Sequence, residues 1–255
     1  MFASSDFTPP LRVACLGDSL TKGNESLYDG GPKPRALRLL GNYPRVLASL
    51  LPPTLPAPSS RRGSGRSLQV VVRNFGRGGA TANFDGRNVY ARSAQFDAAL
   101  AWRPHVALLL LGTNDARSDA RSDAVHRGIV RLAARLRKLP SRPALALLLP
   151  PRVLYNETFS GLPPGTLERR RTELVLPALR RAARELTPRT GESALCTKSS
   201  FRLWDTSEAL PDDPSLYVGD GIHPSPAGAA RLATAVAEKL RHCLRVCEYP
   251  SASAQ

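Results

Sequence analysis

The sequence contains no long apolar run. No stretch of about 18 or more apolar residues appears, so no segment is expected to span a bilayer as a helix. The first residues, Met1 to Leu11, also lack the basic start and the apolar stretch of a secretion signal. A standard secretion signal is therefore not indicated. This favours a cytoplasmic location, although the sequence leaves the compartment open.

Cysteine is scarce, with four residues in a chain of 255. This is too few for a disulfide scaffold in a domain of this size, and the spacing does not fit a metal site. Cys15 lies in an apolar strand pattern, where a small buried hydrophobe is expected. Cys243 and Cys247 either pair with Cys196 or remain reduced. No cysteine is assigned a catalytic role, and neither a metal nor an organic cofactor is expected.

Lysine is scarce as well. Only five of the 36 basic residues are lysine, and the formal net charge of +15 comes from arginines scattered along the chain. No zinc-finger spacing, RNP-type aromatic motif or basic run longer than Arg169-Arg170-Arg171 is present, so a nucleic-acid partner is not expected. Two interpretations stay open: a compositional bias toward arginine, and a basic surface for an anionic partner. The oligomeric state is not indicated.

Five short apolar segments are expected to form strands. Three of them do not alternate with polar residues and are followed at once by Gly or Pro, which is typical of strands covered on both faces in a parallel sheet. Two further segments show the pattern less clearly. The five are Val13–Leu16, Leu68–Val72, Val106–Leu111, Ala144–Leu149 and Phe201–Trp204.

Helical segments separate these strands. The last helix is expected to begin at Ser225-Pro226, a cap residue followed by proline at the first helical position. The alternation of strands and helices predicts right-handed crossovers and a three-layer α/β/α sandwich with a five-stranded parallel sheet. We expect a single domain over residues 11–245, with flexible termini at residues 1–10 and 246–255. Ligands of such sheets bind at the carboxyl ends of the strands.

A serine motif follows the first predicted strand. In Gly17-Asp18-Ser19-Leu20, Ser19 stands at the carboxyl edge of the sheet, where the next helix begins. Unpaired N–H groups at a helix start favour a developing oxyanion. A serine after a strand is also a common helix cap, so this motif alone does not decide between nucleophile and cap.

A possible base lies just ahead of the last helix, in Asp220-Gly221-Ile222-His223-Pro224. A serine hydroxyl needs a base to accept its proton, and a neutral imidazole suits that task near neutral pH. An adjacent carboxylate fixes the imidazole tautomer and stabilises the imidazolium. Of the four histidines, His223 combines such a carboxylate with a loop setting. Asp220 and His223 are therefore the candidate acid–base pair.

Two further motifs follow strands. Asn74-Phe75-Gly76-Arg77-Gly78-Gly79 lets the backbone turn sharply, and an oxyanion-binding N–H from Gly79 is favoured over a phosphate cradle because neither phosphate-binding motif is present. In Gly112-Thr113-Asn114-Asp115, the Asn114 side chain can donate into the cleft. Asn114 can also simply form an Asx-turn, and Asp115 is expected to support that turn.

Together the four motifs resemble the four blocks of the SGNH hydrolase family, also called GDSL esterases or lipases. The resemblance runs from about Arg12 to Leu240. It implies a flavodoxin-like α/β fold, a triad of one serine, one histidine and one aspartate, and an oxyanion hole with three donors. The residues it assigns are Ser19, Asp220 and His223 for the triad, Ser19, Gly79 and Asn114 for the oxyanion hole, and Asp18, Asn74 and Gly76 as supporting residues.

Within that family, Asn74–Thr81, Gln95–Leu100 and Arg103-Pro104 are similar to lysophospholipase-like and carbohydrate O-acetylesterase-like members. This implies a serine esterase for short acyl groups, acting on a small-molecule or glycan ester. A lysophospholipase or thioesterase for longer acyl chains is the alternative enzyme. A non-catalytic basic binding module on the same fold is a rival from another class.

The chain also departs from the family pattern. His105 stands where an acidic residue is usual. Two long insertions, residues 24–37 and 52–67, are expected to be loops without secondary structure. These departures leave the triad intact and put substrate choice in doubt.

Overall fold

The computed structural model describes residues 10–23, 41–56, 67–118, 120–154, 162–187 and 200–246. The predicted loop 24–37, Cys196 and Cys247 lie outside these ranges, as do most of the predicted flexible termini. No helix in the described ranges is long and apolar enough to cross a membrane.

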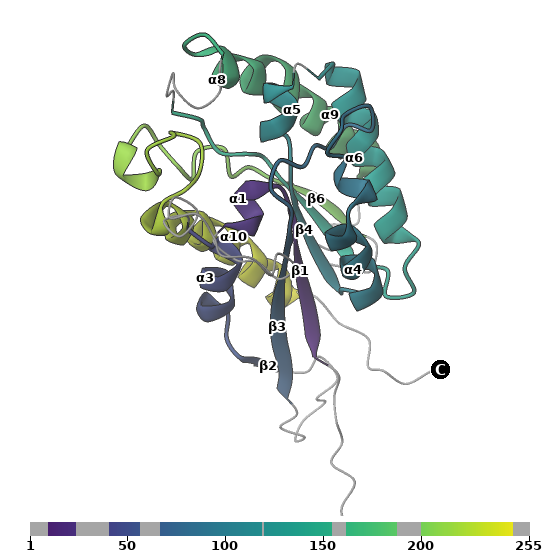
Figure 1. Cartoon of the computed structure of the whole chain (residues 1–255). Coiled ribbons are helices and arrows are strands. Elements are labelled where there is room, and N and C mark those ends of the chain that lie inside the picture. Colours follow the sequence, from purple (N-terminus) through teal and green to yellow (C-terminus); the bar gives the residue numbers. More distant parts are fainter. Residues whose placement is uncertain are drawn as a thin grey trace, which may run out of the picture.

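The centre of the fold is a sheet with five parallel strands, as predicted (Figure 1). The strand order across the sheet is β2-β3-β1-β4-β5-β6. The chain passes from β1 to β3 on one side of β1, and then crosses to β4 on the other side. The parallel strands are β1 (Leu11–Gly17), β3 (Ser67–Gly76), β4 (Val106–Leu110), β5 (Ala144–Leu148) and β6 (Phe201–Trp204).

The expectation of a loop without secondary structure over residues 52–67 was wrong at both of its ends. Residues Thr54–Pro56 form β2, a short edge strand antiparallel to β3, and β3 itself begins at Ser67. The Pro-rich sequence resembles a loop, but an edge strand tolerates proline because one row of its N–H groups needs no partner strand. Within the described residues the sheet therefore has six strands, of which β2 alone is antiparallel.

Helices cover both faces of the sheet, which confirms the three-layer architecture. One layer contains α4 (Ala94–Trp102), α6 (Ser122–Arg137) and α9 (Leu176–Leu186). The other contains α3 (Tyr43–Leu50) and α10 (Pro226–Val246). Figure 1 shows these two groups on opposite sides of the strands.

The core divides in the same way. Successive side chains of a strand point to opposite faces. In β4, Leu109 accordingly packs into the cluster with α4, α6 and α9, while Leu108 and Leu110 pack into the cluster with α3 and α10. All three leucines are buried. This two-sided burial explains why the strand sequence is apolar without alternation.

The start of α10 agrees with the prediction. The Ser225 hydroxyl oxygen accepts a hydrogen bond from the Gly228 N–H at 3.3 Å, and the helix begins at Pro226. This cap fixes the end of the segment that carries His223. Cys15 is buried as expected, and burial raises the pKa of the Cys243 thiol to about 11. The pairing of Cys196 and Cys247 lies outside the described residues.

Short helical segments gather at the carboxyl end of the sheet. In Figure 1, α1, α5 and α8 lie toward the end where the strands of the central sheet finish. They are α1 (Ser19–Lys22), α5 (Thr113–Arg117), α8 (Thr166–Arg170) and the π-helical segment η2 (Arg171–Val175); two single 3-10 turns are η1 (Tyr90–Arg92) and η3 (Pro214–Leu216).

Candidate active site

The three predicted triad residues meet in the structure. Ser19 opens α1 directly after β1, and its Oγ lies 2.7 Å from His223 Nε2, although 204 positions separate the two residues in the sequence. On the other side of the imidazole, His223 Nδ1 lies 2.6 Å from Asp220 Oδ2. The His223 and Asp220 side chains are 14% and 13% exposed. They form a continuous hydrogen-bonded chain that still reaches solvent.

The Asp220 carboxylate is held by its own loop. Asp220 Oδ1 accepts hydrogen bonds from the N–H groups of Ile222, at 2.8 Å, and His223, at 2.9 Å. Burial would raise the pKa of Asp220, but the hydrogen bond and charge of His223 and the two N–H donors together hold it below its usual range. An ionised carboxylate at Nδ1 keeps the proton on that nitrogen, so Nε2 is available to accept the Ser19 proton.

The segment Tyr217–Pro224, here termed the acid–base loop, is a compact turn. Tyr217 and Pro224 form an isolated antiparallel bridge, and the Val218 N–H donates to the His223 carbonyl at 2.9 Å. Gly221 has a φ of 64°, and a Cβ at this position would overlap the Leu154 carbonyl oxygen. Glycine is therefore required here both by the backbone conformation and by the neighbouring chain.

The segment Gly17–Lys22, here termed the nucleophile turn, is held by neighbouring strands. Gly17 pairs with Gly76 of β3 on one side and with Leu110 of β4 on the other. The Arg77 N–H donates to the Gly17 carbonyl at 2.8 Å, and the Asp18 N–H donates to the Leu110 carbonyl at 3.3 Å. The serine motif, the glycine-rich motif and the asparagine motif are thus brought to one level of the sheet edge.

The predicted oxyanion-hole residues Gly79 and Asn114 lie on neighbouring segments, Gly79 in the glycine-rich loop and Asn114 in α5. Gly79 has a φ of 72°, in a turn that Ala80 closes by donating its N–H to the Arg77 carbonyl. Asn114 Nδ2 donates to the Ala80 carbonyl at 3.0 Å, which docks the asparagine onto the glycine-rich loop. An amide group has two N–H donors, so Asn114 retains a second one for a ligand.

Asn74 and Gly76, predicted as supporting residues, join the glycine-rich loop to the nucleophile turn. Asn74 Nδ2 donates to the carbonyls of Thr21, at 2.9 Å, and Lys22, at 3.2 Å, while its Oδ1 accepts from the Gly76 N–H at 2.9 Å. A Cβ on Gly76 would overlap the Lys22 backbone nitrogen. Both residues therefore fix the distance between the two loops.

Asp18, the third predicted supporting residue, is fully buried. Its Oδ1 accepts from the Leu20 N–H at 2.9 Å and so caps α1. Its Oδ2 has no hydrogen-bond partner among the described residues. Burial raises the pKa of Asp18 to about 7, although the Leu20 N–H and the nearby His223 lower it.

The Asp115 side chain binds a different segment from the turn that its motif predicted it to support. Its Oδ2 accepts from the Ala82 N–H at 2.9 Å, and its Oδ1 accepts from the backbone N–H and the side-chain Nδ2 of Asn83, at 2.9 and 2.8 Å. Burial raises the pKa of Asp115 against these three hydrogen bonds. Asp115 therefore clamps the glycine-rich loop to the turn that carries Asn114. Its position next to Asn114 was the one available signal in the sequence.

His105, the departure from the family pattern, lies away from this site. It precedes β4, and its Nδ1 accepts from the Arg12 N–H at 3.0 Å at the start of β1. The parallel strands begin at one end of the sheet and finish at the other end, where the site lies. His105 lies at the beginning of β4, and therefore at the end of the sheet opposite to the site.

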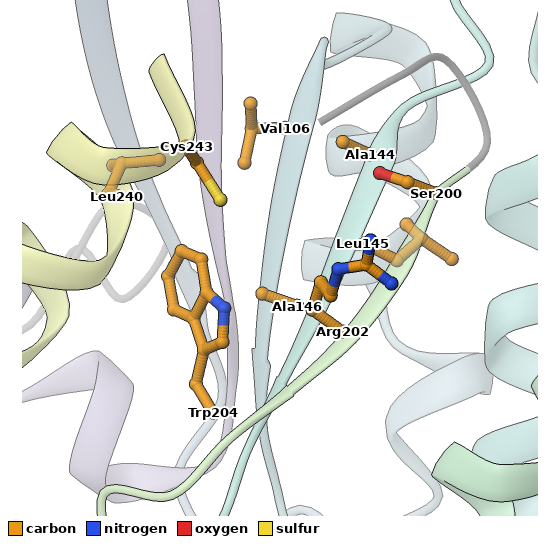
Figure 2. Close-up of a pocket in the computed structure, with 9 residues that line it drawn as sticks. All are labelled: Val106, Ala144, Leu145, Ala146, Ser200, Arg202, Trp204, Leu240 and Cys243. Carbon is orange, nitrogen blue, oxygen red and sulfur yellow. The ribbon is translucent and has the colours of Figure 1, made fainter. Parts of the chain in front are cut away.

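A pocket between α10 and strands β4 to β6 is also separate from the site (Figure 2). It includes the first residues of β4 and β5, and Figure 2 shows Trp204 and Cys243 on one side of it and Arg202 across from them. None of the predicted site residues lines it. Among the described residues, no group of His, Cys, Asp or Glu side chains is arranged to hold a metal ion.

Comparison with known proteins adds a family match. A family model described as the GDSL-like lipase/acylhydrolase family matches residues 15–231. The chain is 24% identical over 244 residues to an acetylxylan esterase of Xylanibacter ruminicola, an alignment that covers 91% of this chain and 43% of that protein. The chain therefore spans less than half the length of this curated relative.

Solved structures share the fold. An aryl esterase of M. smegmatis is 22% identical, with a TM-score of 0.59 and coverage of 91% of this chain and 99% of that one. A catalytic mutant of Axe2, an acetylxylan esterase from Geobacillus stearothermophilus, is 19% identical, with a TM-score of 0.58 and coverage of 92% and 95%. Likeness at this level of identity establishes the fold alone.

Proposed function

The chain belongs to the GDSL-like lipase/acylhydrolase family, the SGNH hydrolases that its motifs resemble, and from this premise we propose that it is a serine esterase that hydrolyses carboxylic esters through an acyl-enzyme. The observation that carries the proposal is the hydrogen-bonded chain from Ser19 through His223 to Asp220, with distances of 2.7 and 2.6 Å. Each side chain has the partner that its role requires.

In the first half-reaction, His223 Nε2 takes the proton of Ser19 as the Ser19 Oγ attacks the ester carbonyl carbon. The carbonyl electron pair moves onto the oxygen, which gives a tetrahedral oxyanion. The ionised Asp220 stabilises the imidazolium that forms. When the intermediate collapses, the bond to the alcohol oxygen breaks, and His223 gives its proton to the departing alcohol.

The oxyanion is stabilised by three donors: the N–H groups of Ser19 and Gly79 and the second N–H of the Asn114 amide. Neither Ser19 nor Gly79 uses its N–H in a hydrogen bond within the described residues. The Asp115 clamp and the Asn114 contact with Ala80 keep the donors in place before substrate arrives. Donors fixed in advance need no reorganisation when charge develops.

In the second half-reaction, water replaces the alcohol. His223 removes a proton from water as the water oxygen attacks the acyl carbon. When the bond to the Ser19 Oγ breaks and the acyl group leaves as a carboxylic acid, His223 returns the proton to the Ser19 Oγ. The groups that formed the acyl-enzyme thus also break it down.

For the substrate, we propose short acyl esters, acetyl esters of carbohydrates first among them. The sequence similarity to an acetylxylan esterase and the fold shared with Axe2 support this choice. A rate series with p-nitrophenyl esters from acetate to palmitate tests it. Rates that peak at acetate support a short-acyl enzyme, whereas a peak at palmitate would favour the lysophospholipase-type alternative.

The reaction type is tested with p-nitrophenyl acetate and purified Ser19→Ala. The variant is expected to hydrolyse the ester several orders of magnitude more slowly than the wild type, because it lacks the nucleophile and retains only the oxyanion donors. Equal rates for the wild type and Ser19→Ala would refute the proposal. Together with salt-dependent retention on heparin, that result would favour the basic binding module.

A further inference from the structure

Arg171 differs from the other two members of its basic run because it is buried, with 2% of the residue exposed. Its guanidinium binds Glu168 in a forked arrangement: Nε donates to Oε2 at 2.7 Å, and Nη2 donates to Oε1 at 2.5 Å. Its remaining nitrogen, Nη1, donates to the Pro150 carbonyl at 3.0 Å. Only the arginine is buried in this pair, since the Glu168 side chain is 26% exposed. An ion pair that includes a buried guanidinium is a poor general stabiliser because desolvation offsets its attraction. Its contacts therefore suggest a more specific task.

The ion pair holds both ends of the segment that follows β5. Arg171 binds the Pro150 carbonyl at one end, and Glu168 Oε2 accepts from the Val153 N–H, at 2.9 Å, at the other. Neither contact is part of a helix or of the sheet. Residues 150–154 are thus held by two side chains from α8 and η2, together with the main-chain hydrogen bond from the Arg152 N–H to the Ser207 carbonyl at 3.2 Å.

This segment supports the acid–base loop at two points. The Tyr217 hydroxyl donates to the Arg152 carbonyl at 2.8 Å, at the beginning of the loop. Farther along, Gly221 packs directly against the Leu154 carbonyl, with no room for a Cβ. Because Gly221 lies between Asp220 and His223, any shift of residues 150–154 is transmitted to both side chains.

We propose that Glu168 and Arg171 are positioning residues, which hold Asp220 and His223 in register with Ser19 through the segment 150–154. This proposal rests on the esterase function proposed above. Neither residue touches the reacting atoms. Their effect is geometric, and a small misplacement of a catalytic group caused by a distant substitution can lower the rate by up to about 100-fold.

The test compares single variants with a double variant. Glu168→Leu leaves the buried Arg171 guanidinium without its carboxylate, and Arg171→Met leaves the partly exposed Glu168 without its guanidinium, so both are expected to lower Tm and kcat, the first more strongly. The double variant Glu168→Leu/Arg171→Met leaves no orphaned charge, so its Tm is expected to recover toward the wild-type value. Its kcat is expected to stay about 10- to 100-fold low, because the contacts to Val153 and Pro150 are still absent. A double variant that regains wild-type kcat would overturn the proposal.

The matched control is Asp123→Leu/Arg181→Met. This pair also joins an arginine to a carboxylate, but the two side chains are 54% and 44% exposed and connect α6 with α9. Its kcat is expected to remain at the wild-type value. An equal loss of kcat in this control would show that removing any ion pair lowers the rate, and would contradict a specific role for Glu168 and Arg171.

A second readout needs no substrate. In proton NMR, the Nδ1 proton that His223 shares with Asp220 is expected far downfield in the wild type. It should shift or broaden in the Glu168→Leu/Arg171→Met variant and stay unchanged in the control. An unchanged signal in the double variant refutes the positioning role. If no ester is hydrolysed faster by the wild type than by Ser19→Ala, the proposed function fails, while this signal still tests the positioning contacts.

Discussion

The nucleophile turn and the acid–base loop approach the same serine–histidine contact but are held in different ways. The nucleophile turn is joined to the sheet, since Gly17 lies between Gly76 and Leu110. The acid–base loop lies beyond the last strand. Its own main-chain hydrogen bonds close the turn, and it is joined to the rest of the protein by contacts from Tyr217 to Arg152 and from Gly221 to Leu154.

Their carboxylates differ in the same sense. Asp220 in the acid–base loop has all of its hydrogen bonds and a lowered pKa, whereas Asp18 in the nucleophile turn is buried with one oxygen unpartnered. A turn paired into the sheet tolerates one unsatisfied oxygen, because Asp18 still caps α1 through its other oxygen. A loop outside the sheet, joined to the protein by few contacts, depends more strongly on each of them. The acid–base loop should thus be the more sensitive region to isosteric substitutions.

Asp220→Asn is the strongest test of this difference. The amide keeps the size of the side chain but cannot stabilise an imidazolium, and it favours the wrong tautomer of His223. We expect kcat on p-nitrophenyl acetate to fall by about 10⁴-fold with the fold retained, as in other serine triads. Circular dichroism verifies the fold. A loss below tenfold in a folded variant would mean that the carboxylate does not orient His223.

Asn114→Ala tests the oxyanion donors that lie beside the nucleophile turn. It removes one donor and the contact with the Ala80 carbonyl. We expect kcat to fall by about 10²- to 10³-fold with little change in KM, because the missing interaction forms mainly in the transition state. Steady-state kinetics with p-nitrophenyl acetate measures both constants. A rise in KM at constant kcat would assign Asn114 to ground-state binding instead.

Asp115→Asn tests whether the clamp acts through the donors that it holds. The asparagine side chain replaces one accepting oxygen of Asp115 by an NH₂ group, which cannot accept from the N–H groups of Ala82 and Asn83. One buried hydrogen bond is therefore lost, at a cost of roughly 1–3 kcal/mol in unfolding free energy. We expect kcat to fall by about tenfold, less than on removal of a whole donor. Urea unfolding and kinetics are measured on the same sample. Reduced stability with unchanged kcat would confine Asp115 to a structural role.

The difference between segments joined to the sheet and segments held by distant contacts also explains how much of this site could be predicted from the sequence. The strands of the parallel sheet were predictable because a strand buried on both faces is apolar throughout, as Val106–Leu110 is. The candidate site residues were predictable because each stands in a short motif at a strand end or just before a helix. Their positions in the structure agree with those motifs, while their catalytic roles stay predictions.

What the sequence did not predict depends on contacts between distant segments. Arg171 stands in a run of three arginines, and nothing in one sequence separates the buried member from its neighbours. Its hydrogen bond to Pro150 joins residues 21 positions apart, and that contact matters only because Gly221 packs beside Leu154. The edge strand β2 was missed for a related reason, because only its pairing with β3 makes a strand of a Pro-rich segment.

Asp18→Asn gives the smallest expected effect and tests the tolerance of the nucleophile turn. The asparagine Oδ1 can still cap α1 by accepting from the Leu20 N–H, so kcat at neutral pH should change by only about tenfold or less, well below the loss expected on removal of one oxyanion donor. The clearer result is in stability. In the folded protein the pKa of Asp18 is raised from 3.8 to about 7 by burial, so the folded state holds a proton that the unfolded chain releases. Ionisation of the unfolded chain therefore destabilises the wild type progressively from about pH 4 to about pH 7, and the effect levels off above that range.

Asn cannot ionise, so the Tm of Asp18→Asn relative to the wild type should rise across this interval and then stay constant. A difference in Tm that does not vary between pH 4 and pH 7 would mean that Asp18 is ionised in the folded protein, and that the nucleophile turn satisfies its carboxylate as fully as the acid–base loop satisfies Asp220.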